Sequence, residues 1–275
     1  MLKYLKNLLC GHGILLAEAI PLSKCRIVRP DKLERCGFSS SNELTAVIFA
    51  IPYYTRQSER NISAYAVPRD YHLFCQELFS DVIPRLSQEF EGFKFAGFAD
   101  NSPIDERDAA AMAGLGIVGD NMMLITEKYS SYVFLAEIIT DYPIKTEKDF
   151  SIKHCESCGA CRRACPMDRI GNCLSALTQK KGELSDSERS AILEYGSAWG
   201  CDICQEVCPH TLRAIECDSI YSPIPFFNED LTPTLTSEKI ENMSDEDFYR
   251  RAYSWRKKET ILRNLKLFEE NRKTN

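Results

Sequence analysis

The alternation of hydrophobic and polar residues divides the first part of the chain into short strands and helices. Residues 44–51 (LTAVIFAI) form an apolar run of strand length, and residues 93–99 (FKFAGFA) predict another strand. Between them, residues 70–90 have the spacing of an amphipathic helix, strained at Pro84. The first part of the chain is therefore mixed α and β.

The later part of the chain contains further short elements and no repeat except a duplicated cysteine pattern. An alanine-rich helix and two strands come first, then a polar helix, and after the proline-rich SPIPFF segment one or two terminal helices. These elements are expected at residues 106–114, 122–126, 132–140, 185–195 and 245–271.

Composition fits a globular chain of 275 residues, 44% hydrophobic and 27% charged, with one larger and one smaller domain. The longest apolar runs have strand length and fall short of the roughly 20 residues that cross a bilayer. The N-terminal segment is a poor signal peptide, because His12 and Glu18 interrupt its apolar core. We therefore expect a monomeric protein of the reducing cytoplasm, without a membrane anchor.

Eight of the thirteen cysteines follow the spacing of iron–sulfur ligands. The first run reads CxxCxxCxxxCP, in which a bacterial ferredoxin gives three thiolates to one [4Fe–4S] cluster and the fourth to another. The second run is split, because 27 residues separate its first cysteine from the remaining CxxCxxxCP. We expect two clusters in a ferredoxin-like region, one held by Cys155, Cys158, Cys161 and Cys208, the other by Cys165, Cys173, Cys201 and Cys204.

Zinc is the main alternative, since CxxC pairs in cytosolic proteins often bind zinc. Zinc takes four ligands per site and rarely uses CxxCxxCxxxCP, so the spacing favours iron–sulfur clusters over zinc or disulfides. The remaining five cysteines are expected to be small buried residues, with Cys217 as the one plausible spare ligand.

A GxGxxG sequence at Gly114, Gly116 and Gly119 superficially fits a dinucleotide-binding loop, with Glu137 some 20 residues further on. That loop requires a strand before it and a helix after it, whereas here the pattern predicts a helix before and a strand after. The glycines are expected instead to let the backbone approach a flat ligand or a packed strand.

Several segments together resemble the epoxyqueuosine reductase family. The resemblance rests on FADNSPIDERDAAAMAGLGIVGDNMMLI, SSYVFLAEIIT, CESCGACRRACP, CLSALTQKKG and GCDICQEVCPH, with IPYYT and NISAYAVPRDYH upstream and SDEDFYRRAYSWRKKETILRN downstream. It covers roughly residues 44–271. Members usually continue with a helical-repeat domain beyond this point, and position 67 is Val where a more polar or aromatic residue is expected. These departures bear on the substrate more than on the cofactors.

The resemblance implies an α+β fold with three parts. A reductive-dehalogenase-like α/β domain (1–145) would bind cobalamin and carry out catalysis. A ferredoxin-like domain with two [4Fe–4S] clusters (146–220) and a basic helical segment (221–275) would follow. Such an enzyme reduces the epoxide of epoxyqueuosine in tRNA to queuosine, and an external low-potential donor such as a flavodoxin or ferredoxin would supply the electrons.

The resemblance also implies residue roles. The family motif that carries the general acid matches residues 99–107, and the matching acid is Asp100. A general acid near neutral pH needs a raised pKa, which an apolar corrin face could provide. The alternative is that Asp100 caps the following helix, and Asp105 is the rival carboxylate, placed where a cap would lie.

For cobalamin, the matching motifs point to Asn121, Ser175 and Asp202 as pocket residues. Each could instead only support a neighbouring cluster ligand or a turn. His72 is expected to be a core residue or to act through its neighbours, and not to be a lower ligand of cobalt.

The charge distribution bears on the partner. The net charge of the chain is −6, yet residues 250–273 hold nine Lys or Arg against three Glu, so this segment is +6 and the remainder −12. A basic lip of this kind, extended by Lys180 and Lys181, would hold tRNA phosphates. A solvated helix face is the alternative. Two other functions remain open, a corrinoid iron–sulfur reductase of a small molecule and a ferredoxin-type electron carrier without catalysis.

Overall fold

The computed structural model describes residues 1–38, 43–56, 59–145, 148–167 and 173–274. The chain forms two compact units, each described separately. The first comprises Met1–Tyr53, His72–Cys158 and His210–Ile224, and the second Tyr54–Tyr71, Gly159–Pro209 and Pro225–Asn275.

The first unit is built on a four-stranded antiparallel sheet of order β1-β2-β6-β3. The central strands β2 and β6 pair over their whole length, with Ile48 opposite Glu137. On the other neighbour of β6, strand β3, Phe98 lies opposite the same Glu137. The strands are β1 (Leu16–Pro21), β2 (Thr45–Pro52), β3 (Phe95–Ala99) and β6 (Val133–Thr140). All eight residues of β2 are buried, which explains why its sequence is apolar without alternation.

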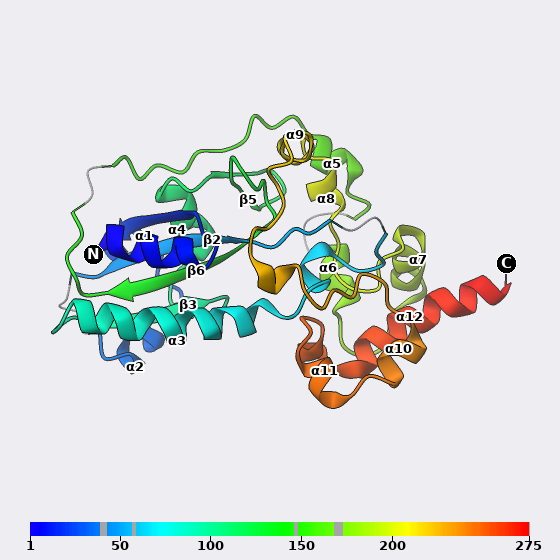
Figure 1. The fold of residues 1–275 in the computed structure, drawn as a ribbon. Coiled ribbons are helices and arrows are strands. Elements are labelled where there is room, and N and C mark those ends of the chain that lie inside the picture. Colours follow the sequence, from blue (N-terminus) through cyan, green and yellow to red (C-terminus); the bar gives the residue numbers. More distant parts are fainter. Residues whose placement is uncertain (39–42, 57–58, 146–147, 168–172, 275) are drawn as a thin grey trace. The chain divides into compact units, whose positions relative to one another are not determined.

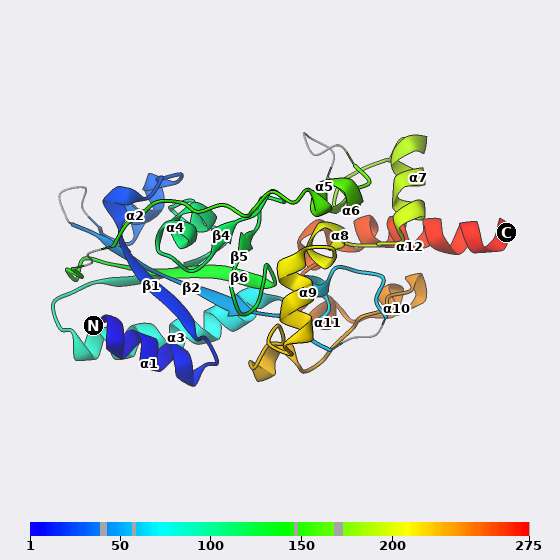
Figure 2. The same cartoon turned by 90° about the horizontal axis from the view of Figure 1, so that it is seen from above.

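Helices cover both faces of this sheet (Figures 1 and 2). On one face lie α1 (Leu2–Gly11) and α3 (Tyr71–Glu89), where the Phe79 ring fills the space left by Gly97. On the other face lie α2 (Pro30–Arg35) and α4 (Glu106–Met112), whose alanines pack on Ile48 and Ile139. Small side chains let α4 approach the sheet closely, which places its first turn beside the strand ends.

A small hairpin and one further helix complete the first unit. The hairpin joins β4 (Ile117–Val118) to β5 (Leu124–Ile125), and its residues run antiparallel. Helix α9 (Pro209–Glu216) is tied to the turn before β6, because Ser130 and Thr211 share a hydrogen bond of 2.7 Å between their hydroxyls.

The second unit consists of short helices around a core that contains Trp199 and Tyr253, both fully buried. The buried Asn264 fixes its long last helix by donating to the carbonyls of Thr178 (2.7 Å) and Ala198 (2.8 Å). The helices are α5 (Ala160–Ala164), α6 (Leu174–Thr178), α7 (Asp186–Tyr195), α8 (Ile203–Glu206), α10 (Ser237–Glu241), α11 (Asp245–Tyr249) and α12 (Lys257–Thr274). A short 3₁₀ turn at Leu22–Lys24 belongs to the first unit, and those at Ala64–Ala66, Pro225–Phe227 and Ser254–Arg256 belong to the second.

The α+β fold class expected from the sequence is confirmed, and the expected strands and helices are present. The sequence did not predict α1 and β1, which occupy the segment considered as a weak signal peptide. The three-part division at residues 145 and 220 stays a prediction, since the compact units are drawn from interleaved segments. Among the described residues, none of the helices combines the length and apolar character that crossing a membrane requires.

Candidate active-site residues

Asp100 lies on the turn that joins β3 to α4 in the first unit. Its backbone is left-handed, with φ at +60°, and its side chain is 70% exposed. Its carboxylate oxygen Oδ2 lies 3.8 Å from Nε2 of His72. Aspartate adopts this conformation more readily than most residues, and six other non-glycine residues in the described part of the chain share a positive φ. The turn therefore displays the carboxyl without being unusual in its backbone.

The helix cap is Asp105, not Asp100. The Asp105 carboxylate accepts the backbone N–H of Asp108 at 3.3 Å, in the usual geometry of an N-cap. Asp100 therefore does not have the capping role that the sequence offered as its alternative.

The turn is held by hydrogen bonds at several points. The backbone N–H of Asp100 donates to Oε1 of Glu106 at 3.1 Å, and the hydroxyl of Ser102 donates to Oε1 of Glu137. The carbonyl of Pro103 accepts the backbone N–H groups of Val28 (2.8 Å) and Arg29 (3.1 Å). Glu106 and Glu137 thus support the turn that carries Asp100, a role that the sequence did not predict for either glutamate.

Glu106 and Glu137 form a buried carboxyl pair. Burial raises the pKa of Glu106 to about 7, and the negative charges of Asp100 and Asp105 add to the shift. Burial first and the charge of Glu106 second raise the pKa of Glu137 well above its usual value. The signal for this pair was present in YVFLAEIIT, where a charged residue interrupts a strand pattern at an inward position.

The glycine stretch forms the β4–β5 hairpin and does not have the strand–loop–helix order of a dinucleotide-binding loop, since α4 precedes it and β4 begins directly after Gly116. A side chain at Gly116 would overlap the carbonyl oxygen of Ile125, and one at Gly119 would overlap the amide oxygen of Asn121. These glycines therefore allow a packed strand to approach, one of the two roles expected from the sequence.

Asn121 carries an unsatisfied polar group. Its Oδ1 accepts the backbone N–H of Met123 at 3.2 Å, whereas its Nδ2 is buried without a hydrogen-bond partner among the described residues. The neighbouring Asp120 donates its backbone N–H to Sγ of Cys155 at 3.4 Å. The hairpin thus places a free amide donor beside an expected cluster ligand, an arrangement that a bound polar group could complete.

In the second unit, five of the expected cluster cysteines influence one another. Burial first, then the charges of Cys201, Cys173, Cys161 and Cys165, raise the pKa of the Cys204 thiol to about 12. Burial also raises the pKa of Cys201 to about 11, with smaller effects from Asp202, Cys173 and Cys165. Cys161, Cys165, Cys173 and Cys201 therefore lie near Cys204, and the division of these cysteines between two clusters stays a prediction.

The described residues contain no group of three His, Cys, Asp or Glu side chains arranged to hold a single metal ion. The choice between iron–sulfur clusters and zinc therefore stays a prediction from the cysteine spacing.

Asp202 and Ser175 lie in the second unit, next to cluster cysteines. Asp202 is 6% exposed and accepts hydrogen bonds from the Ser63 hydroxyl (2.5 Å), the Ala64 N–H (2.7 Å) and Arg60 (3.2 Å). Ser175 is bonded through its hydroxyl to Gln179 at 3.2 Å. Asp202 thus anchors the segment before Tyr65, and a cobalamin contact by either residue stays a prediction.

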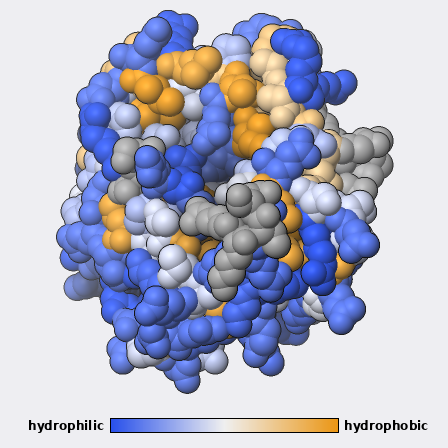
Figure 3. All heavy atoms as spheres, turned by 90° about the vertical axis from the view of Figure 1, so that its right-hand side faces the viewer, coloured by the Kyte–Doolittle hydropathy of each residue, from blue (hydrophilic) through white to orange (hydrophobic). Residues whose placement is uncertain are grey.

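Two hollows of the second unit include cluster cysteines. One, of about 500 Å³, is lined by Cys201, Asp202 and Arg60. The other, of about 860 Å³, is lined by Cys173, Lys181 and Arg256 and by Lys180, which is paired with Glu188 at 2.7 Å, and we call it the basic hollow. The face seen in Figure 3 is mostly hydrophilic, with hydrophobic side chains in separate groups.

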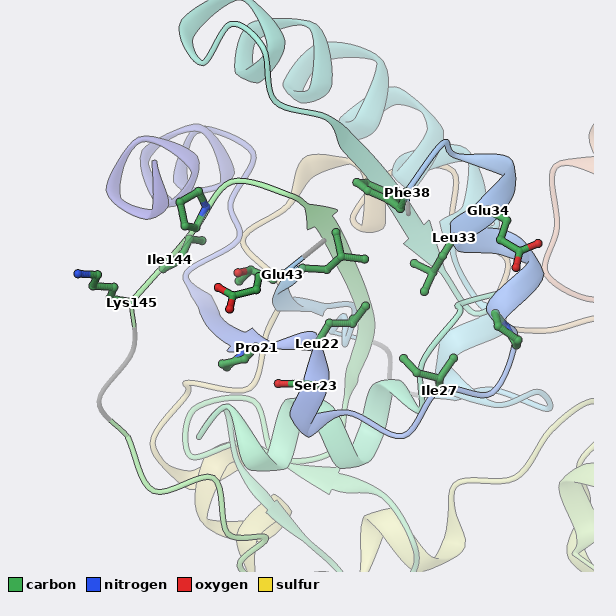
Figure 4. A pocket seen from close by; sticks show the side chains of 14 residues that line it. Pro21, Leu22, Ser23, Ile27, Leu33, Glu34, Phe38, Glu43, Ile144 and Lys145 are labelled. Carbon is green, nitrogen blue, oxygen red and sulfur yellow. The ribbon is translucent and has the colours of Figure 1, made fainter. Parts of the chain in front are cut away.

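The first unit has a cavity of about 840 Å³ away from these residues, between the 3₁₀ turn after β1, α2 and the start of β2 (Figure 4). Leu22, Ile27, Leu33 and Phe38 make its wall largely apolar. None of the expected catalytic, cobalamin-binding or cluster residues lines it.

Known proteins similar to this chain include several epoxyqueuosine reductases. No protein-family model matches the chain. The epoxyqueuosine reductase of Gloeobacter violaceus is 30% identical over 223 residues, which cover 75% of this chain and 68% of the relative. The chain belongs to the epoxyqueuosine reductase family. The epoxyqueuosine reductase of Bacillus subtilis is 34% identical over 78% of this chain and 57% of its own length. The match to the epoxyqueuosine reductase of Pseudomonas aeruginosa covers only 43% of that relative's length.

Solved epoxyqueuosine reductases have the same fold. The Streptococcus thermophilus structure covers 98% of this chain and 81% of its own, with a TM-score of 0.74 and 21% identity. The structure of an epoxyqueuosine reductase with an epoxyqueuosine-modified tRNA-Tyr stem loop gives a TM-score of 0.72 at 23% identity, and covers 97% of this chain and 79% of its own. The reductive dehalogenase NpRdhA aligns over 80% of this chain and 34% of its own, with a TM-score of 0.50 and 16% identity. The fold is therefore that of epoxyqueuosine reductases, with a wider likeness to reductive dehalogenases.

Proposed function

We propose that the protein is an oxidoreductase that reduces the epoxide of epoxyqueuosine in tRNA to the alkene of queuosine. The observation that carries the proposal is Asp100, displayed on a left-handed turn at the position that matches the family's acid. In Bacillus subtilis epoxyqueuosine reductase, a catalytic loop bearing an aspartate is swung out of the active site in one structure. The β3–α4 turn would be the corresponding loop here.

The net reaction consumes two electrons and two protons and releases the epoxide oxygen as water. The eight cysteines would hold two [4Fe–4S] clusters that receive electrons from an external donor such as a flavodoxin or ferredoxin. Cobalamin, when bound, would supply these electrons to the substrate carbon. The buried free amide of Asn121 fits a polar group of that cofactor, with Ser175 and Asp202 as further candidate contacts.

Asp100 would donate a proton to the oxygen that leaves. Its side chain is exposed in the free protein, and burial against the bound cofactor and base would favour the protonated carboxyl that a general acid requires. The left-handed turn keeps the carboxyl directed outward, and the bonds at Asp100 N–H and Ser102 keep the turn in place. Positioning of this kind contributes to rate by removing the need to order the acid at each turnover.

The tRNA would contact the basic hollow. Lys181 and Arg256 line this hollow with Cys173, so candidate phosphate-binding groups lie beside an expected cluster ligand, whereas Lys180 is paired with Glu188 there. Phosphate contacts would give affinity, and a pocket for the flipped base would give specificity.

The test is anaerobic reconstitution with iron, sulfide and cobalamin, followed by an assay on tRNA that carries epoxyqueuosine. We expect about eight irons and one cobalt per chain and conversion to queuosine. Replacement Asp100→Asn should lower the rate about 10²- to 10⁴-fold while metal content and the cobalamin spectrum stay unchanged.

Asp218→Asn is the matched control, because Asp218 is also left-handed (φ +55°) and exposed. Unchanged activity in Asp100→Asn would reject the acid role. A reconstituted chain that converts no tRNA-bound epoxide would reject the function itself.

A further inference from the structure

Glu137 is an acidic residue in the centre of an apolar sheet face. It has no exposed surface, and its direct neighbours across the sheet are Ile48 of β2 and Phe98 of β3. An ionised carboxylate in such a place is unfavourable unless it is paired or keeps its proton. Its Oε2 is buried, and no described residue offers it a hydrogen bond that satisfies normal geometry.

The two oxygens of Glu137 have different neighbours. Oε1 accepts the Ser102 hydroxyl, which in turn accepts the backbone N–H of Ile104 at 3.0 Å. Glu137 also interacts with the carboxyl of Glu106. Glu106 in turn accepts the backbone N–H of Asp100 at 3.1 Å. A continuous line of contacts therefore runs from the sheet centre to both ends of the turn.

We propose that Glu106 and Glu137 form a proton-sharing carboxyl clamp that positions the turn carrying Asp100. That the clamp positions Asp100 for catalysis rests on the proposed function. That the two carboxyls share a proton does not. Both glutamates are positioning residues, since they act through the Asp100 turn. A proton on Glu137 donates to Glu106, and Glu106 then accepts the Asp100 N–H as a charged acceptor.

The surroundings explain why the proton stays in the pair. Asp100 and Asp105 face it from the turn, and Cys25 faces it from the segment after the first 3₁₀ turn. On α4 the nearest cation, Arg107, is engaged by Asp108 at 2.8 Å. On the sheet side both neighbours are apolar. The charged groups that face the pair are thus acidic, which opposes a second negative charge.

The first test detects the shared proton directly. Infrared spectra of the reconstituted full chain at neutral pH should contain the carbonyl stretch of a protonated carboxyl. Glu137→Gln should remove that band, since it takes away the fully buried carboxyl that keeps its proton. Glu106→Gln should instead shift the band, because the proton of Glu137 then has a neutral amide as its acceptor in place of a carboxylate. Asp108→Asn is the control on the same helix and should leave the band unchanged. A band that persists in Glu137→Gln, or that is unshifted in Glu106→Gln, overturns the proposal.

The second test measures how strongly the clamp protects the backbone of the Asp100 turn from exchange. Hydrogen–deuterium exchange of a peptide covering residues 99–105, corrected for intrinsic rates, should show protection that rises about tenfold as the pair loses one proton near pH 7. The reason is that ionised Glu106 accepts the Asp100 N–H more strongly. Glu106→Gln should make the protection independent of pH, and Asp108→Asn should not. Protection in Glu106→Gln that follows pH as in the native protein overturns the clamp.

Neither measurement requires turnover. An inactive protein with both signatures would reject the reductase function and leave the clamp standing. An active protein without them would reject the clamp alone.

Discussion

At the scale of single residues, the structure connects a residue of left-handed backbone conformation with a residue of unusual burial. Asp100 has a left-handed backbone that most residues avoid, and Glu137 places a carboxyl where an apolar side chain would pack. Glu106 links the two through the Asp100 N–H and the Glu137 carboxyl. Ionisable groups of shifted pKa tend to cluster where function requires them, so the contact of this pair with the Asp100 turn supports the site assignment.

The buried pair predicts how stability depends on pH. Both carboxyls have pKa values raised in the folded state, so above about pH 4.5 the folded protein binds more protons than the unfolded chain. Stability therefore falls as pH rises toward 7, by at most about 1.4 kcal/mol per pH unit for each retained proton. Glu137→Gln should remove one such contribution and flatten the decline, as measured by urea unfolding at several pH values between about 5 and 7.

Glu18→Gln provides the contrast. The ion pairs of Glu18 with Lys148 (2.5 Å) and Lys6 (2.9 Å) outweigh its burial and lower its pKa, so its contribution is lost only as pH falls below its usual range. The decline between about pH 5 and 7 should persist in this variant. An equal slope in native protein and Glu137→Gln would show that Glu137 is ionised.

At the scale of elements, the β4–β5 hairpin connects the glycine stretch to the cofactors. It brings the free amide of Asn121 and the N–H of Asp120 next to each other, and the latter donates to Cys155. This requires backbone contact at Gly116, where β4 meets the carbonyl of Ile125. The hairpin is therefore the element on which the expected cobalamin contact and the cluster ligand both depend.

Gly116→Ala tests that dependence. The added methyl would overlap the Ile125 carbonyl oxygen and lie 3.2 Å from the Cα of Thr126, and a backbone cannot move away as a flexible side chain can. We expect a destabilisation of about 1–3 kcal/mol, seen as a fall in Tm of several degrees, together with weaker cobalamin retention. Gly11→Ala is the control, because Gly11 ends α1 with nothing within 4 Å, and it should be neutral or slightly stabilising. A stable Gly116→Ala protein would show that the hairpin packs differently.

Elements with strong periodicity were predictable from the sequence. The strand at Thr45–Pro52 and the helix at Tyr71–Glu89 follow directly from apolar runs and helical spacing, whereas the cluster assignment from the CxxC spacing stays a prediction. Helix α1 and strand β1 were missed because a short apolar N-terminal segment has the same composition as a weak export signal. The carboxyl pair was missed because Glu106 and Glu137 are 31 positions apart and meet only through the packing of α4 on β6.

At the scale of the whole molecule, the cations of the basic C-terminal segment have different structural roles. Of the cations in residues 250–273, Arg251 is buried and bound to Asp230 at 2.7 Å, and Arg263 donates to the carbonyls of Lys180 and Gly182. These two stabilise the second unit. Arg256 lines the basic hollow and stacks on Trp255, whose side chain is 57% exposed. Sequence charge alone does not separate these duties, since only packing shows which cations are engaged internally.

RNA affinity should depend on the cations that line the basic hollow. Replacing Lys181 and Arg256 together by Gln should weaken binding of tRNA and reduce the slope of log affinity against log salt by about one for each phosphate that is no longer neutralised. Both residues line the basic hollow with Cys173, and the effect should be similar for modified and unmodified tRNA, because phosphate contacts do not read the base. Lys266→Gln is the matched control on α12, since Lys266 is paired with Glu241 at 2.8 Å and does not line that hollow. Binding measured at several salt concentrations separates the outcomes, and an unchanged slope in the double variant would place the tRNA on another surface.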